Sequence, residues 1–188
     1  MITHPLFIEM MNEHKAILSL IANAESKLQE PCFKKLLIEI HEVAEQKHHH
    51  KEETLLFKKI YLNKHIHEGG PMCTFFYDFH MMERPRQKVE KIIQKELSIE
   101  PHQNEILITK CPLVIPIEEH QSGKDLLIYL IENFENLDPQ LKKSYFELYK
   151  SIQVSHINKE ENCLYRMCAD LLSPQEADEI LEEWKKAS

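Results

Sequence analysis

The chain has few glycines and no long apolar segment. Only 3 of its 188 residues are glycine, and no apolar run approaches the about 18 residues that suggest a membrane-spanning helix. The N-terminus also lacks the basic and then apolar order of a secretory signal peptide. These absences favour a helical protein in the cytoplasm, with no membrane partner.

Paired cysteine motifs are also missing. The five cysteines contain no Cys-x-x-Cys pair, so the sequence gives no support for a zinc ribbon or a thioredoxin-like site. An odd number of cysteines without a secretory signal favours free thiols in a reducing compartment. We predict that they act as small buried hydrophobic residues: Cys32, Cys73, Cys111, Cys163 and Cys168.

The charge and size of the chain exclude further classes. A net charge of −8 argues against non-specific binding to nucleic acid or to anionic membranes. Hydrophobic residues make up 43% and charged residues 29%, an ordinary composition for a globular protein. With 188 residues, we expect one well-buried domain that spans residues 1–188.

Histidine is the residue type in excess, with 12 copies. The segments His48–Phe57 and His156–Tyr165 share the pattern His-x-x-x-Glu-Glu-x-x-Leu-aromatic. Residues four apart lie one turn above each other on the same face of a helix. An imidazole nitrogen and a carboxylate aimed at one point form half of a site for iron, zinc or manganese. Two such halves predict two metal ions, or one ion shared between them.

Hydrophobic periodicity predicts a succession of helices. Asp138-Pro139 and the capping box of Ser173-Pro174-Gln175-Glu176 mark two helix starts. A further helix over 71–98, kinked or split at Pro85, and a packed loop over 99–116 form an inserted segment, 72–112. The stretch 106–108 could form a strand, but a single strand has no sheet to join. The remaining helices are expected at about 5–28, 31–64, 116–135, 139–171 and 174–186.

The chain contains an internal repeat. Glu13-His14 matches Glu119-His120 at an offset of 106 residues, and His48/Glu52 matches His156/Glu160 at an offset of 108. The simplest explanation is two helical hairpins, residues 5–68 and 116–171, packed as a four-helix bundle with approximate two-fold symmetry. Burying so many polar groups costs several kcal/mol each unless they are satisfied, and a pair of metal ions satisfies all of them. The expected ligands are His14, His48, Glu52, His120, His156 and Glu160.

The order of these motifs resembles the haemerythrin-like, or HHE cation-binding, domain family. Gly69-Gly70-Pro71 also resembles the linker of that family, and the similarity covers about residues 5–84 and 112–170. The resemblance implies an up-and-down four-helix bundle that holds a non-haem di-iron centre. Most of the inserted segment and the C-terminal helix at 174–186 lie outside the similarity, so the expected fold is an all-α bundle of this kind with an inserted helical or loop segment and an additional C-terminal helix. The resemblance also implies four terminal histidine ligands and bridging roles for Glu52 and Glu160.

One departure from the family concerns the third helix. Oxygen-carrying haemerythrins have a His-x-x-x-His pair there, whereas Lys124 follows His120 by four residues and Pro116 precedes it by four. His80, nine residues after Pro71, is the candidate to supply the missing ligand. The segments around His80 and His120 therefore compete for the third-helix role, or both contribute.

Other polar residues near the motifs have simpler interpretations. His41 is balanced between core packing and support of a metal ligand, and Gly123 either eases packing or leaves space for a small ligand. Glu53 and Glu161 are expected to point outward, and Phe57 and Tyr165 to be core residues. Five further histidines in the first half and centre of the chain are expected to be solvated: His49, His50, His65, His67 and His102.

These observations predict a protein with two iron ions, or alternatively manganese or zinc. It would bind or react with a small ligand such as dioxygen, peroxide or nitric oxide in sensing, stress response or iron handling. The alternatives are a metal-responsive regulatory module without catalysis, an iron donor for iron–sulfur cluster repair, and a mononuclear zinc or purely structural helical protein. The sequence does not decide whether the protein is an enzyme or whether it has a protein partner.

Overall fold

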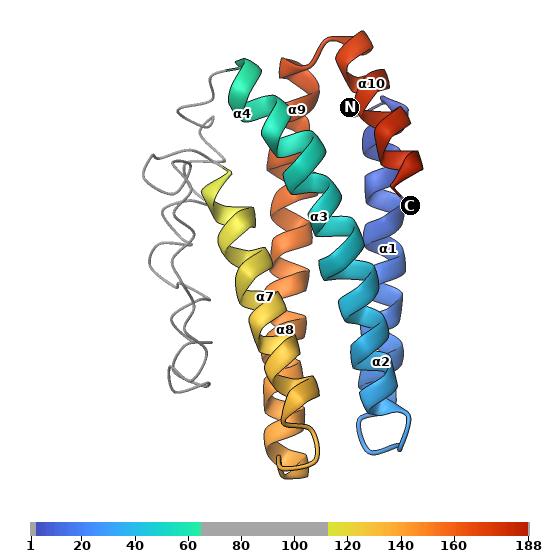
Figure 1. Ribbon diagram of the computed structural model, residues 1–188, viewed down its shortest axis with the longest axis vertical. Coiled ribbons are helices and arrows are strands. Elements are labelled where there is room, and N and C mark those ends of the chain that lie inside the picture. Colours follow the sequence, from blue (N-terminus) through green and yellow to red (C-terminus); the bar gives the residue numbers. More distant parts are fainter. Residues whose placement is uncertain (1–2, 65–112, 188) are drawn as a thin grey trace.

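The computed structural model describes residues 3–64 and 113–187, and all its regular elements are helical. Within these two ranges there is no strand, so the expected all-α class is confirmed. The helices pack lengthwise as a bundle (Figure 1). The predicted insertion at 72–112, with its kinked helix and its strand alternative, lies outside the described residues, as does His80.

The first half of the chain forms α1 (Pro5–Ser26) and a second, longer helical rod. This rod is unbroken from residue 33 to residue 64, although its backbone changes hydrogen-bonding pattern along the way. Two π-helical segments, in which each N–H bonds the carbonyl five residues back, alternate with α-helical ones. The order is α2 (Phe33–Ile40), η1 (His41–His48), α3 (His49–Lys51), η2 (Glu52–Phe57) and α4 (Lys58–Lys64).

The second half repeats this arrangement and adds a helix. Asp138 caps α8 by accepting hydrogen bonds from the backbone N–H groups of Gln140 and Leu141. Ser173 and Glu176 form the expected capping box at the start of the last helix. The elements are α7 (Val114–Glu132), α8 (Pro139–Lys159), η4 (Glu160–Leu164), α9 (Tyr165–Leu171) and α10 (Pro174–Lys186).

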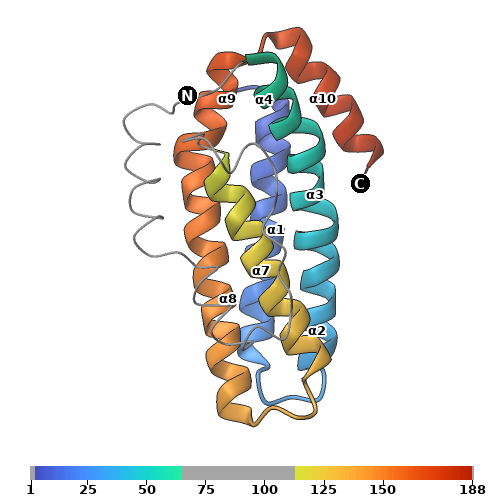
Figure 2. The same cartoon turned by 60° about the vertical axis from the view of Figure 1, so that its left-hand side comes forward.

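The long rods lie side by side in both views of the molecule (Figures 1 and 2). The turns that follow α1 and α7 lie at the same end of the bundle (Figure 1). After α9 the chain reverses, and α10 packs against α1 and η2. None of the helices in the two described ranges is both long and apolar enough to cross a membrane.

Two apolar clusters fill the interior. One contains Phe7, Phe57 and Trp184, and the other contains Phe33 and Phe146. Along the long rods, the polar residues of the sequence motifs fall at or next to the boundary between the two clusters. On α1, for example, the buried His14 lies between Met10 of one cluster and Ile17 of the other. A polar layer therefore crosses the bundle between two apolar ends.

The cysteines do not all match the expectation. Cys32 and Cys168 form no disulfide, as predicted, but Cys163 is disulfide-bonded. Counting cysteines could not detect this bond, because pairing depends on which residues the fold brings together.

Replacing Phe33 with alanine tests the cluster that is remote from α10. The Phe33 ring is fully buried, and its centroid lies 5.3 Å from that of Phe146 in an edge-on arrangement. We expect Phe33→Ala to lower the free energy of unfolding by about 3–5 kcal/mol, measured by urea unfolding of chelator-treated protein. The control Ile38→Ala, at a side chain that is 40% exposed, should change it by less than about 1 kcal/mol. Equal losses in the two variants would contradict the packing.

Candidate metal centre

The polar layer contains two groups of side chains that could each hold a metal ion. One group is His49, Glu52, His120 and His156, and the other is His14, His48, Glu52 and Glu160. Within each group one ligand atom from every residue lies within 4.8 Å of the others, and all of the residues are buried. Glu52 belongs to both groups, so the two positions are adjacent and share a carboxylate.

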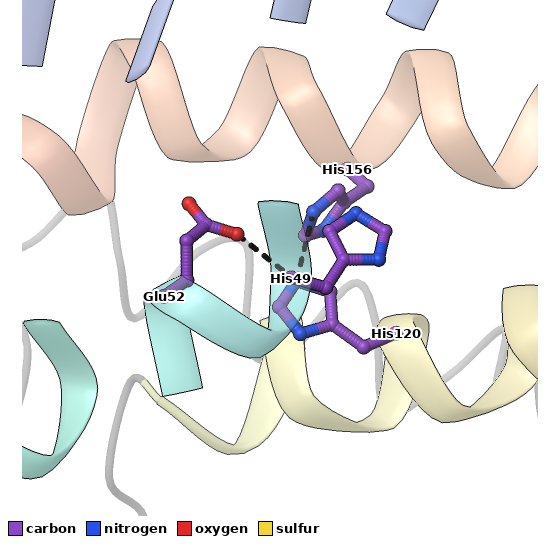
Figure 3. A group of neighbouring side chains, drawn as sticks. All are labelled: His49, Glu52, His120 and His156. Carbon is purple, nitrogen blue, oxygen red and sulfur yellow. Dashed lines mark hydrogen bonds and ion pairs between the residues drawn. The ribbon is translucent and has the colours of Figure 1, made fainter. Parts of the chain in front are cut away.

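The first group joins three helical rods (Figure 3). His49 and Glu52 come from the second rod, His120 from α7 and His156 from α8. The Nε2 atoms of His120 and His156 are 3.1 Å apart, and His120 Nε2 lies 3.4 Å from Glu52 Oε2. These donor atoms converge on one region of the interior (Figure 3).

The second group is arranged around Glu160 and the same Oε2 atom of Glu52 that faces His120. His14 Nε2 lies 3.3 Å from Glu160 Oε2, and His48 Nε2 lies 3.6 Å from Glu52 Oε2. Glu160 Oε2 is also 3.1 Å from Nε2 of His156, a member of the first group. Both carboxylates therefore lie between the two positions, as bridging ligands would.

A carboxylate lies near the Nδ1 atom of each of these histidines. Four pairs are hydrogen-bonded: His14 with Glu161 at 3.0 Å, His48 with Glu13 at 2.8 Å, His120 with Glu53 at 2.8 Å and His49 with Glu45 at 2.8 Å. In the fifth pair, His156 Nδ1 lies 3.4 Å from Glu119 Oε2, which is an ion-pair contact and not a hydrogen bond. When Nδ1–H donates to a carboxylate, the lone pair of Nε2 faces the interior, which is the tautomer that a metal ligand needs.

Four of these pairs obey the internal repeat. Glu13 with His48 corresponds to Glu119 with His156, and each carboxylate also bonds a lysine, Lys51 or Lys159. In the same way, the pair of Glu161 and His14 corresponds to that of Glu53 and His120. The repeat thus extends from the candidate ligands to the residues that orient them.

The structure brings together six of the seven predicted ligands. These are His14, His48, Glu52, His120, His156 and Glu160, and the seventh, His80, is not among the described residues. His41 belongs to neither group, and its Nε2 lies 3.3 Å from the side-chain nitrogen of Gln46. No metal role is assigned to it.

The expectation that His49 is solvated was wrong. Its side chain is only 3% exposed, and it completes the first group. In a regular α-helix His49 would be rotated by about 100° from His48. Here it directly follows η1, and a π turn contains more residues than an α turn, which shifts the following side chains around the helix. Glu45, four residues before His49, was the signal that could have indicated a buried pair.

The expectation that Glu53 and Glu161 are merely outward-pointing charges was also wrong. Their side chains are 36% and 32% exposed, yet their carboxylates reach the Nδ1 atoms of His120 and His14. Each partner lies on another helical rod, so the pairing could not be read from local spacing. Matching the two repeats to each other would have identified both residues together.

Tyr165 and Phe57 occupy equivalent positions in the repeat but differ chemically. Both are buried, as predicted for core residues. The Tyr165 hydroxyl also donates to Glu52 and lies 3.1 Å from His14 Nε2. Phe57 instead places its ring parallel to that of His120, with centroids 5.9 Å apart. Among the residues that the structure describes, a phenol hydroxyl therefore contacts His14 at one position, and the equivalent place at the other position holds a phenyl ring.

Gly123 eases the packing of a polar network. A Cβ atom at this position would lie 2.7 Å from Gln153 Nε2, a group that donates to Glu45. Glu45 also accepts from Tyr149 and from His49. The space beside Gly123 is therefore filled by the network that holds His49, which favours the packing interpretation over space for a ligand.

The paired charges shift the pKa values of the cluster. Burial alone would lower the pKa of each histidine, but hydrogen bonds and attraction to carboxylates raise it to about 9 for His14 and His120 and to about 10 for His156. At His49, burial and repulsion from His120 dominate and lower the pKa to about 4. Burial opposes ionisation of Glu160, but its histidine neighbours hold its pKa well below the usual range. Without metal, protons on the imidazoles therefore balance the buried carboxylates.

The donor atoms fit a metal ion. His48 Nε2, His49 Nε2, Glu52 Oε2 and both oxygens of Glu160 are buried and make no hydrogen bond within the described parts of the chain. Buried polar atoms are normally satisfied, and here they face the two convergence points. Imidazole nitrogen and carboxylate oxygen suit iron, manganese and zinc, and they do not choose among these metals.

The raised histidine pKa values predict how the stability of metal-free protein depends on pH. In the folded protein, the pKa values of His14, His120 and His156 lie above the ordinary histidine value of 6.5. Their contribution is therefore complete below pH 6.5 and is lost as the pH rises toward 9 and 10. His49 acts oppositely, and its contribution is lost as the pH falls from 6.5 toward 4.

We expect the unfolding free energy of chelator-treated protein to fall between about pH 7 and 9, by at least about 1 kcal/mol per pH unit, which corresponds to one linked proton. Urea titrations at several pH values measure it. A free energy that is constant or rises over this range would show that the histidines are not held as described.

Comparison with known proteins gives no family for this chain: no family model matches it, and neither a curated protein nor a solved structure matches it significantly.

Proposed function

We propose that this chain is a haemerythrin-like metalloprotein with two metal ions, most suitably iron, with manganese and zinc as alternatives. In this proposal the long rods form an up-and-down four-helix bundle, and the centre binds or reacts with dioxygen, peroxide, nitric oxide or a similar small ligand. The order of motifs along the chain and the side-by-side packing of the rods support this assignment.

One observation carries the proposal. Glu52 is shared by two buried groups of nitrogen and oxygen donors, and Glu160 approaches histidines from both groups. A shared carboxylate places two cations close together, where a single ligand can contact both. A mononuclear zinc site or a purely structural helical protein would not require two adjacent positions.

The surroundings of the centre favour a small ligand. Its donor residues are buried between two apolar clusters, and this burial favours a ligand of only a few atoms over a larger substrate. When bound, iron supplies an open coordination position and exchangeable electrons. The chain supplies a dry interior, oriented imidazoles and, at the His14–His48 position, the Tyr165 hydroxyl as a hydrogen-bond donor.

The metal content of single variants tests the ligand assignment. Wild-type protein should hold about two metal ions per chain, and Glu52→Ala or Glu160→Ala should lose most of this metal, because both positions use these carboxylates. His49→Ala should lose about half, since it removes a donor from only one position. The control is His50→Ala, at an exposed histidine of the same segment, which should keep both metals. Elemental analysis measures the metal content of all four variants. Equal metal content in the four would contradict the ligand assignment.

The response to small ligands tests the chemical role. Anaerobically prepared protein loaded with iron(II) should change its near-ultraviolet absorption when dioxygen or peroxide is added, because either oxidant would convert iron(II) to iron(III). Zinc-loaded protein is the matched control, because zinc has no redox chemistry. Protein with two bound irons and no spectral change on adding dioxygen, peroxide or nitric oxide would contradict the small-ligand role and leave the metal site intact.

A further inference from the structure

We propose that docking of α10 and metal binding at the His14–His48 position are coupled through Glu13, with Trp184 of α10 acting as a positioning residue for His48. This inference rests on the proposed metal centre. It goes beyond it by assigning a role to the helix that lies outside the repeat.

The Glu13 carboxylate joins α10 to a candidate metal ligand. Its Oε2 atom accepts a hydrogen bond of 2.8 Å from His48 Nδ1. Its Oε1 atom accepts one of 2.8 Å from the Trp184 indole and one of 2.6 Å from Lys51. Both oxygens are thus used, and movement of the indole disturbs the same carboxylate that orients His48.

Trp184 makes this contact as part of the packed interior. It is the only tryptophan of the chain and is fully buried. Its ring lies edge-on to the His48 ring at 5.7 Å, and Lys51 Nζ lies 4.4 Å from its centroid. The indole therefore contacts the ligand, the carboxylate that orients the ligand, and the cation that balances the carboxylate.

Metal binding at His48 Nε2 requires the proton to be on Nδ1, where it is donated to Glu13. In a neutral imidazole without metal, the proton can occupy either nitrogen. The other tautomer turns a lone pair toward the Glu13 carboxylate, which weakens the arrangement that also accepts the Trp184 N–H. Metal thus favours the geometry in which α10 is docked.

Thermodynamic linkage makes this effect reciprocal. If docked α10 raises the affinity for metal by some factor, bound metal must stabilise docking by the same factor. The docked face of α10 is short, with Ala177, Ile180, Leu181 and Trp184 as its buried residues. A change in one strong polar contact can therefore alter a measurable share of its docking equilibrium.

The repeat supplies a matched control. Glu119 corresponds to Glu13 and contacts His156 and Lys159 as Glu13 contacts His48 and Lys51. An indole has one N–H, and Trp184 donates it to Glu13. Changes at Glu119 thus remove an equivalent support for a histidine without touching the link from Trp184.

Hydrogen exchange of residues 174–186, measured by mass spectrometry with and without iron(II) under anaerobic conditions, tests the coupling. In wild-type protein, iron should slow exchange in α10 by about tenfold or more, the size of effect expected for support of a ligand. Glu13→Gln should lose this response because an amide has only one acceptor oxygen, so its NH2 group must face either His48 Nδ1–H or the Trp184 and Lys51 donors. Glu119→Gln should keep it. Iron content is measured on every sample.

A second variant tests the link without changing a carboxylate. Trp184→Phe keeps a buried ring but removes the N–H, and it should weaken iron binding at one position by about threefold to tenfold, the cost of one hydrogen bond. Combined with Glu13→Gln, it should add little further loss, because both changes break the same link.

The failures of the two proposals are distinguishable. Two bound irons with unchanged exchange in α10, equal responses in the Glu13 and Glu119 variants, or unchanged iron affinity in Trp184→Phe would overturn the coupling and leave the metal centre standing. Wild-type protein that binds no iron would overturn the metal centre and the coupling with it.

Discussion

A layer of carboxylates and imidazoles crosses the middle of an otherwise apolar helical bundle, and the arrangement of the helices depends on satisfying it. A buried carboxylate such as Glu52 or Glu160 costs several kcal/mol unless positive charge and hydrogen bonds surround it. Without metal, protons on His14, His120 and His156 provide that charge, which is why their pKa values are raised. Metal ions can replace these protons at the same positions. The layer thus favours one packing of the helices, because sliding a rod would leave charges unpaired.

The internal repeat explains the layer, and its exceptions explain why the two positions differ. Each half supplies two supporting glutamates, two histidines and one central carboxylate in equivalent places. The symmetry fails at His49, whose counterpart is Ile157, and at Glu45, whose counterpart is Gln153. It also fails at Tyr165, whose counterpart is Phe57. One position gains a third imidazole and the other gains a phenol, so equivalent backbones present different chemistry.

Much of the centre could be predicted from spacing within single helices. His48 with Glu52, and His156 with Glu160, were identifiable because a helix places residues four apart on one face. The helix starts at Pro139 and Pro174 could also be predicted, because helix caps are formed by residues that are neighbours in the sequence. The role of His49 was missed because the helix changes to a π pattern just before it. The roles of Glu53 and Glu161 were missed because their histidine partners lie on other rods.

The sequence by itself determined the helical class, the helix starts, the two-fold repeat and six residues of the polar layer. All of these follow from short-range periodicity and from offsets that can be counted along the chain. Only the tertiary structure decided that Glu52 is shared by both groups, that His49 faces inward, and that α10 reaches Glu13 through Trp184. These depend on how separate helices approach one another and on the hydrogen-bonding pattern of the backbone, and spacing along one helix does not contain that information.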